Sequence, residues 1–438
     1  MSNRRVSDLI LRNVSAVVID PPSVRRCDIR IRTGTIRDVS RRLTPLREEE
    51  VLDLSGAIVM PGLVCSHTHL YSALARGMPG PKTSPENFLE ILKKVWWKLD
   101  EALDEEAIYY SALVGAIESV KLGTTTLVDH HASPNCIPGS LDLIKKAMSY
   151  VGMRGILCYE TTDRGGIKRR NLGLRENEQF ISANKKSDCF RGAVGAHASF
   201  TLVDDSMRRL GELAKHYNTG VHIHAGEDRA DVRGAERAYR TGLVTRLAKF
   251  GLVREKSILA HGVHLTKPEL AGVDKAGAWI IHNPRSNMNN AVGHAPLQWF
   301  GKRSALGTDG FPADMFEEAR FGFMRNAETN QDSPFSKLPA MMQGGQRLVS
   351  EYFGQQVGAF AKRSSADLIV LDYDPPTPLD RGNLQAHVLF GMHASMVRHV
   401  MIGGRWVVWN RKPVNVDEEE IREKARRVAT KLWKKMAH

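Results

Sequence analysis

The chain is poor in the features that mark secreted, membrane and disulfide-rich proteins. Its 438 residues include five cysteines, which are far apart and never form a CxxC pair: Cys27, Cys65, Cys136, Cys158 and Cys189. This excludes a disulfide framework and a cysteine zinc knuckle, and it favours reduced thiols in a cytoplasm. No apolar run reaches the roughly 18–20 residues that a membrane helix needs, and Arg12, Asn13 and Asp20 interrupt the N-terminal apolar stretch. We therefore expect a cytoplasmic protein without a signal peptide or a membrane partner.

The chain also lacks the motifs that normally accompany its formal charge of +13 in nucleic-acid-binding proteins. The basic residues are spread along the sequence, with no long Lys/Arg block, zinc-finger spacing or RNA-binding aromatic motif. We interpret the charge as a solvated basic surface and expect no nucleic-acid partner. With 42% hydrophobic and 25% charged residues, the composition is that of a folded protein and not of a disordered one.

Both ends of the chain have the pattern of β structure. Apolar and polar residues alternate between turn signals in residues 1–57 and again in 366–414, where Gly403-Gly404 is a two-residue hairpin signal. Residues 417–435 have helical periodicity, with Glu early and Lys late, which suits the helix dipole.

The long middle of the chain alternates short apolar runs with amphipathic stretches of helix length. The expected helices include 102–121, 140–150, 204–217, 233–249 and 314–327. The apolar runs number eight: AIVMPGLVCSH, TTTLVDH, RGILCYE, GAVGAH, GVHIH, SILAH, AWIIHN and SALGTD. Alternating units of this kind imply parallel strands with short connections, and eight of them predict the α/β class with a (β/α)8 barrel.

Nearly every one of these apolar runs ends in an imidazole or a carboxylate. In a barrel the carboxyl ends of all strands meet at one face, where active sites are built. So many titratable groups at one mouth indicate a functional site. The terminal residues are His67, His69, Asp129, His130, His131, Glu160, His197, His224, His261, His282, Asn283 and Asp309.

Four of these residues form a candidate metal centre. His67 and His69 are two residues apart at a strand end, so both side chains point to the same face. His224 from the fifth run and Asp309 from the eighth supply a third and a fourth ligand. Three neutral imidazoles and one carboxylate suit zinc with a position left open for water. His222 competes with His224, but it lies deeper in the strand and is interpreted as a hydrogen-bonded core histidine.

Two further residues are candidates for catalysis. Glu227 follows His224 by three residues and can carry a proton to a leaving group. His261 ends the sixth run and can stabilise a developing oxyanion. His264, three residues later, is interpreted as a structural or outer-shell residue.

These residues lie in motifs that resemble the amidohydrolase superfamily over nearly the whole chain. The similarity is to its chlorohydrolase/cytosine-deaminase-like branch and, within it, to the SsnA-type aminohydrolases. DHHASPN (129–135) points to that subgroup. The shared motifs are VMPGLVCSHTHL (59–70), HAGE (224–227), AHGVHL (260–265), HNPRSNMNNAVG (282–293), GTDG (307–310) and ADLIVLD (366–372).

The resemblance implies a distorted TIM (β/α)8 barrel with a small β-sandwich built by both ends of the chain. The expected composite sandwich domain covers residues 1–57 and 362–438, and the metal-dependent barrel domain covers 58–361. The resemblance assigns the metal to His67, His69, His224 and Asp309, and catalysis to Glu227 and His261. It also implies one divalent ion, zinc or alternatively Fe2+, because the fourth strand (GAVGAHA) lacks the lysine of binuclear relatives. A homodimer is a further expectation from the resemblance.

The predicted activity is that of a mononuclear metal-dependent aminohydrolase of C–N bonds other than peptide bonds (EC 3.5.4-like). The substrate is a small amino-substituted N-heterocycle of the purine, pyrimidine, pterin or triazine type. In this hypothesis metal-bound hydroxide attacks the ring carbon, Asp309 takes a proton from the water, and Glu227 protonates a ring nitrogen and later the departing ammonia. The candidate substrate contacts are Trp97, Asp100, His131, His197, Arg285 and Asn287.

Two other functions stay open at the level of sequence. Hydrolysis of a cyclic amide or amidine with ring opening uses the same site. A non-catalytic scaffold is the third alternative, although such relatives characteristically lose ligands and this chain retains all of them. The stretch Gly310–Asp314 after the aspartate departs from the Ser-Asn-rich pattern of many deaminases, which leaves the substrate undetermined.

Overall fold

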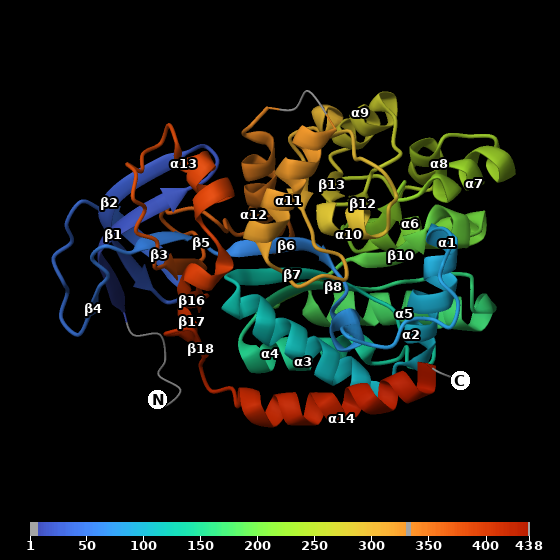
Figure 1. Ribbon diagram of the computed structural model, residues 1–438, viewed down its shortest axis with the longest axis horizontal. Coiled ribbons are helices and arrows are strands. Elements are labelled where there is room, and N and C mark those ends of the chain that lie inside the picture. The colour runs from blue at the N-terminus through green and yellow to red at the C-terminus, as the bar shows by residue number, and fades with distance from the viewer. Residues whose placement is uncertain (1–7, 330–333, 437–438) are drawn as a thin grey trace.

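Parallel strands form the centre of the molecule (Figure 1). The computed structural model describes residues 8–329 and 334–436, so the outermost residues of the expected composite domain lie outside it. The parallel strands form two sheets, with the orders β6-β7-β8-β9 and β10-β11-β12-β13-β14. Their bounds are β6 (Leu63–Thr68), β7 (Thr124–His131), β8 (Arg154–Tyr159), β9 (Phe190–Gly192), β10 (Val194–Ala198), β11 (Val221–Ala225), β12 (Ile258–His261), β13 (Trp279–His282) and β14 (Ser304–Leu306).

Two isolated parallel bridges join these sheets edge to edge. Thr68 at the end of β6 pairs with Asp309 after β14, and Thr161 after β8 pairs with Ala196 of β10. Strand β6 therefore neighbours β14, β8 neighbours β10, and the two sheets surround one interior. The predicted α/β class with parallel strands is confirmed.

Helices cover the outer side of the parallel strands, so these strands are buried on both faces. Every residue of β7 is buried, which explains why these strands are continuous apolar runs in the sequence. The covering helices are α3 (Glu105–Lys121), α4 (Ser140–Val151), α5 (Gly166–Asn184), α6 (Asp204–His216), α7 (Arg229–Tyr239), α8 (Leu243–Lys249), α9 (Lys267–Lys275), α10 (Pro284–Asn289), α11 (Met315–Glu328) and α12 (Lys337–Phe353).

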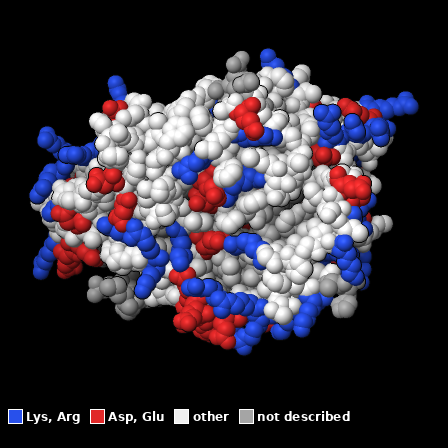
Figure 2. All heavy atoms as spheres, in the orientation of Figure 1, with Lys and Arg blue, Asp and Glu red and all other residues white. Residues whose placement is uncertain are grey.

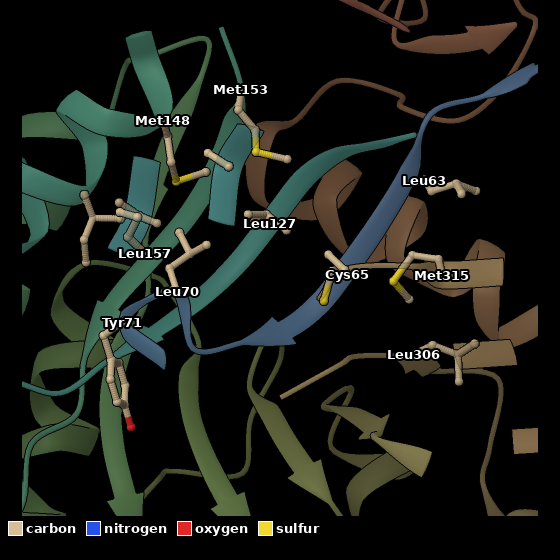
Figure 3. Packing of buried hydrophobic residues seen from close by; sticks show 14 of the residues in the cluster. Leu63, Cys65, Leu70, Tyr71, Leu127, Met148, Met153, Leu157, Leu306 and Met315 are labelled. Atoms are coloured by element: carbon tan, nitrogen blue, oxygen red, sulfur yellow. The ribbon is translucent and has the colours of Figure 1, made fainter. Parts of the chain in front are cut away.

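The layer between strands and helices is one large hydrophobic cluster. Figure 3 shows Cys65 of β6 beside Met315 of α11, and Met148 of α4 near Leu157 of β8. Tyr71 borders this cluster but carries its hydroxyl away from it. The tyrosine lies in η1 (Leu70–Ala75), which directly follows β6.

Short helical turns complete the chain. After η1 come α1 (Phe88–Ile91), the π-helical turn η2 (Leu92–Trp96) and α2 (Trp97–Ala102), which cover the mouth of the strands. The other short turns are η3 (Ser199–Thr201), η4 (Leu297–Trp299), α13 (Leu384–Ala386), η5 (His387–Gly391) and η6 (Ala394–Met396).

Strands from both ends of the chain form one nine-stranded sheet beside the parallel strands. Its order is β18-β17-β16-β15-β5-β1-β2-β3, and β4 pairs with β1. The strands are β1 (Leu9–Val18), β2 (Ser23–Arg32), β3 (Thr35–Ser40), β4 (Glu50–Asp53), β5 (Ile58–Pro61), β15 (Leu368–Leu371), β16 (Val397–Ile402), β17 (Arg405–Trp409) and β18 (Lys412–Pro413).

The central strands of this sheet bury both faces, because successive side chains point to opposite sides. In β15, Leu368 and Val370 belong to the sheet's own core, whereas Ile369 and Leu371 join the cluster around the parallel strands. Strand β5 alternates in the same way and pairs with β1 and β15. The sequence division assigned residues 58–61 to the barrel, whereas their strand pairing lies in this sheet.

The last helix, α14 (Glu418–Met436), runs from the nine-stranded sheet along α3 toward α2 (Figure 1). Ion pairs link it to α3: Lys121 to Glu418 at 2.8 Å and Lys431 to Glu106 at 3.1 Å. Near its end, the indole N–H of Trp433 donates to the main-chain oxygen of Leu74 at 2.8 Å. The helix therefore ties the C-terminal part of the chain to η1.

Basic side chains on the face drawn in Figure 2 are spread over many elements and interleaved with acidic ones. This matches their even spread along the sequence. Among the helices of the described residues, none combines the length and the apolar character needed to cross a membrane.

We expect Trp433→Phe to lower the free energy of unfolding by about 1 kcal/mol, because the carbonyl of Leu74 loses its donor while most of the packing remains. Urea unfolding measures this. Trp299→Phe is the matched control: Trp299 is 40% exposed, and a surface change of this kind costs less than about 0.5 kcal/mol. Equal losses in the two variants would contradict the role given to the hydrogen bond.

Candidate active site

Four predicted ligand residues bring their side-chain atoms to one point. His67 lies in β6, His69 directly follows it, His224 lies in β11, and Asp309 follows β14. The Nε2 atoms of His69 and His224 are 3.1 Å apart. Oδ1 of Asp309 lies 3.3 Å from Nε2 of His67 and 3.0 Å from Nε2 of His69.

The seam between β6 and β14 fixes Asp309 at this point. Its φ of +54° lies in the left-handed region, which is costly for a residue with a side chain. The main chain compensates, because Asp309 N donates to His67 O and His69 N donates to Asp309 O, both at 3.0 Å. The hydroxyl of Ser286 donates to Oδ2 of Asp309 at 2.5 Å, which leaves Oδ1 facing the imidazoles.

Main-chain carbonyls orient two of the three imidazoles. Nδ1–H of His69 donates to His130 O at 2.6 Å, and Nδ1–H of His224 donates to His197 O at 2.9 Å. Such partners hold a ring with Nε2 directed at a metal, as is usual for ligating histidines.

The residues at this point fit a divalent ion. Nε2 of His67 is buried and has no hydrogen-bond donor or acceptor among the described residues. A buried polar atom without a partner is costly unless a ligand satisfies it. His67, His224, His261 and Asp309 bring their ligand atoms within 4.8 Å of one another, so the ring of His261 lies beside the same point. Imidazoles with one carboxylate form the donor set that zinc prefers.

The two predicted catalytic residues lie next to the candidate metal centre. Oε2 of Glu227 is 3.6 Å from Nε2 of His261, and Nδ2 of Asn290 donates to Oε1 of Glu227 at 3.4 Å. Burial, together with the charge of Asp309, raises the pKa of Glu227 well above its usual value. Nδ1–H of His261 donates to Oδ1 of Asn287 at 2.8 Å, which orients the ring.

A cavity of about 60 Å³ opens onto these residues. Its inner wall includes His69, His224, Glu227 and Asp309. Aromatic and acidic side chains from the covering turns and neighbouring strands form the rest: Trp96, Trp97, Phe200, Asp100 and Glu160. A flat ring with polar substituents is the kind of molecule that such walls accommodate.

Residues 58–407 match the model of the amidohydrolase family. The chain belongs to the amidohydrolase family. Like the sequence motifs, this match includes all four residues of the candidate metal centre.

The chain is similar to curated deaminases along nearly its whole length. A 5-methylthioadenosine/S-adenosylhomocysteine deaminase of Thermoanaerobacter pseudethanolicus is 27% identical over 433 residues, which cover 94% of this chain and 96% of that protein. A 5'-deoxyadenosine deaminase of Methanocaldococcus jannaschii is 28% identical, with 92% and 95% covered.

Solved structures of similar fold include two that hold zinc. An adenosine deaminase from Xanthomonas campestris with bound zinc has a TM-score of 0.84 at 22% identity, and the match covers 97% of this chain and 98% of that one. The atrazine chlorohydrolase TrzN from Arthrobacter aurescens, complexed with zinc, has a TM-score of 0.80 at 20% identity, with 96% and 100% covered. These matches confirm the amidohydrolase fold.

Within this amidohydrolase site, three predicted substrate contacts line the cavity, namely Trp97, Asp100 and His197. Burial and the charge of Glu160 raise the pKa of Asp100 to about 8. His197 Nε2 lies 3.8 Å from Glu160, and Nδ1 is 2.7 Å from the hydroxyl of Thr201.

The other three predicted contacts do not line this cavity. Arg285 binds the carboxylates of Glu317 and Glu318 and the carbonyl of Pro312, so each of its three guanidinium nitrogens already has a partner. His131 is fully buried, with Nε2 at 2.9 Å from the hydroxyl of Ser133. Oδ1 of Asn287 accepts from the ring of His261, as described above.

Sequence analysis missed Arg164, which contacts residues of this cavity and lines a second one. Arg164 stacks on Trp97 at 4.5 Å, and its Nη2 lies 2.9 Å from Oε1 of Glu160 and 3.7 Å from Oδ2 of Asp100. Behind this group a second cavity of about 380 Å³ shares Trp97, Asp100 and Glu160 with the first. Glu160 directly follows β8 and was among the strand-end residues that the sequence predicted for the site. Arg164 lies in a loop, where no such signal exists.

We expect His224→Ala to lose its divalent metal, because one of four converging ligand atoms disappears. The loss of affinity should exceed the roughly 10–100-fold that removal of an outer-shell partner costs. Metal analysis of the purified variant measures bound zinc per chain. His393→Ala is the control, since His393 is exposed and bonds Ser395. Wild-type zinc content in His224→Ala would exclude His224 as a ligand.

Proposed function

We propose that the chain is a mononuclear zinc-dependent aminohydrolase that removes an amino group from an adenine-type nucleoside or a related N-heterocycle. The observation that carries this proposal is the convergence of three imidazoles and one carboxylate beside a half-buried Glu227, at the floor of a cavity with aromatic walls. Support also comes from the relatives, whose names are deaminases of adenosine derivatives, and from the zinc in solved amidohydrolase neighbours.

His67, His69, His224 and Asp309 would hold the ion. A divalent ion in such a site lowers the pKa of a bound water from 15.7 to about 7, which supplies a nucleophile at neutral pH. The cavity would hold the heterocycle with its amino-bearing carbon at this point, between Glu227 and the wall made by Trp96 and Trp97.

Glu227 moves protons in the proposed reaction. Its raised pKa favours the protonated carboxyl group, which can protonate a ring nitrogen. Asp309 accepts the proton released by the attacking water at Oδ1, while Ser286 holds Oδ2. Glu227 then regains a proton from Asp309 and delivers it to the amine, which leaves as ammonia. The second proton of the attacking water returns to Glu227 as the carbonyl forms.

His261 stabilises negative charge on oxygen as the ring carbon becomes tetrahedral. Asn287 holds its Nδ1, and Nε2 faces the region of Glu227. Burial lowers the pKa of His261, so Nε2 would donate to the developing oxyanion only after it has taken up a proton from the attacking hydroxyl group, before that proton returns to Glu227. Orientation before the reaction makes such a donor effective, because little reorganisation is needed in the transition state.

The test of the proposed activity is release of ammonia by the zinc-loaded protein. We expect release from at least one member of a panel containing 5'-deoxyadenosine, methylthioadenosine, adenosine, cytosine, a pterin and an aminotriazine. Mass spectrometry of the products separates deamination from ring opening, because ring opening adds water and retains nitrogen. Ring-opened products without ammonia would replace this proposal with the cyclic amide or amidine hydrolase.

Glu227→Gln tests the proton carrier on whichever substrate the panel identifies. We expect kcat to fall about a hundred-fold or more, because the amide cannot donate and regain a proton in the same way. Bound zinc should stay at the wild-type level, since Glu227 is not a proposed ligand. Glu212→Gln on an exposed face of α6 is the control. Full turnover in Glu227→Gln would exclude this role.

A further inference from the structure

A chain of hydrogen bonds crosses the interior of the parallel strands directly beneath the candidate metal centre. Nδ1 of His67 lies 2.8 Å from Nε2 of His222. Nδ1 of His222 lies 3.6 Å from Sγ of Cys158, and this thiol donates to the main-chain oxygen of Asp129 at 3.5 Å. All four residues are fully buried, and they come from β6, β11, β8 and β7.

Each proton in this series of hydrogen bonds can be assigned to one atom. Nε2 of His67 faces Asp309 and the metal position, so Nδ1 carries the proton and donates it. His222 must then accept at Nε2, and its own proton sits on Nδ1, directed at Cys158. Burial raises the pKa of the Cys158 thiol well above its usual value, so the thiol keeps the proton that it donates to Asp129. No donor in the series is left without an acceptor.

His67 differs in this respect from the other two imidazoles of the site. His69 and His224 are held by main-chain carbonyls, which no substitution at the carbonyl residue removes. His67 alone among these three is oriented by a side chain. The orientation of His67 therefore depends on the chemical nature of residue 222.

We propose that His222 is a positioning residue that fixes the tautomer and the orientation of His67, and that Cys158 in turn fixes His222. The proposal rests on the metal centre of the proposed function but not on its substrate. Its alternative is that His222 is a hydrogen-bonded core histidine, as the sequence analysis interpreted it, whose bonds have no effect on the metal. The positioning role and the core role predict different metal affinities when a buried side chain of similar size replaces His222.

The decisive pair of variants is His222→Gln and His222→Leu. Glutamine retains an oxygen that can accept from Nδ1 of His67, whereas leucine fills the space without an acceptor. We expect His222→Leu to weaken Zn2+ binding roughly 10–100-fold, as loss of an outer-shell partner does, and His222→Gln to restore most of the affinity. Competition with a zinc chelator measures the affinity, and the absorption spectrum of the Co2+-loaded protein reports the ligand geometry.

His399→Leu is the matched control, because His399 is a buried histidine of β16 that bonds outside the site. We expect a lower thermal midpoint with wild-type zinc affinity. Should His222→Leu fail to fold, Cys158→Ser and Cys158→Ala provide the same comparison at the next residue of the hydrogen-bond series. Serine keeps the acceptor for His222 and should bind zinc more tightly than alanine.

Wild-type zinc affinity and an unchanged Co2+ spectrum in His222→Leu would overturn the proposal. Equal losses in the Gln and Leu variants would overturn it as well, because both would then reflect packing alone. The readout needs no turnover, so the two proposals fail separately. If zinc binding follows the acceptor at position 222 but no substrate releases ammonia, the positioning role stands and the proposed activity falls.

Discussion

The pairing of β6 with the turn after β14 is the constraint on which the site depends. It holds Asp309 in a left-handed conformation through main-chain bonds to His67 and His69. The same pairing brings the carboxylate up to two imidazoles that the period of a β-strand has already placed on one face. Sheet pairing thus offsets the cost of the strained backbone, and the side chains remain available for ligand binding.

Buried charge around the cavity is balanced by a second set of contacts. Glu160 and Asp100 face the cavity, and Arg164 pairs with the charge of Glu160 while it stacks on Trp97 and lies near Asp100, whose pKa is raised to about 8. On the other side, Arg285 is neutralised by Glu317 and Glu318. The ionisable side chains of the amidohydrolase site are buried together. Most of their charges are paired with opposite charges of the protein itself, as burial requires.

Sequence patterns predicted the residues whose positions follow from strand period and strand ends. They predicted few of the contacts that side chains make with distant parts of the chain. The candidate ligands were found because the three strand ends that carry them must share one face in this fold class. The expected helix 233–249 is instead α7 and α8, because Arg240 adopts a left-handed conformation that ends α7. The apolar run at 57–67 is two strands, β5 and β6, in different sheets. Arg285 was predicted to bind substrate, and only the folded chain reveals the two glutamates of α11 that occupy it.

The nine-stranded sheet has a consequence for the order in which this protein can be assembled. Strand β5 sits between β1, which precedes it in the chain, and β15, which is synthesised only after all the parallel strands. During synthesis β5 therefore lacks its neighbour on one side until β15, near the end of the chain, has been made. Pairings between such distant segments form late and slowly. During synthesis the unpaired edge of β5 could pair with other chains. In the folded protein β15 covers this edge.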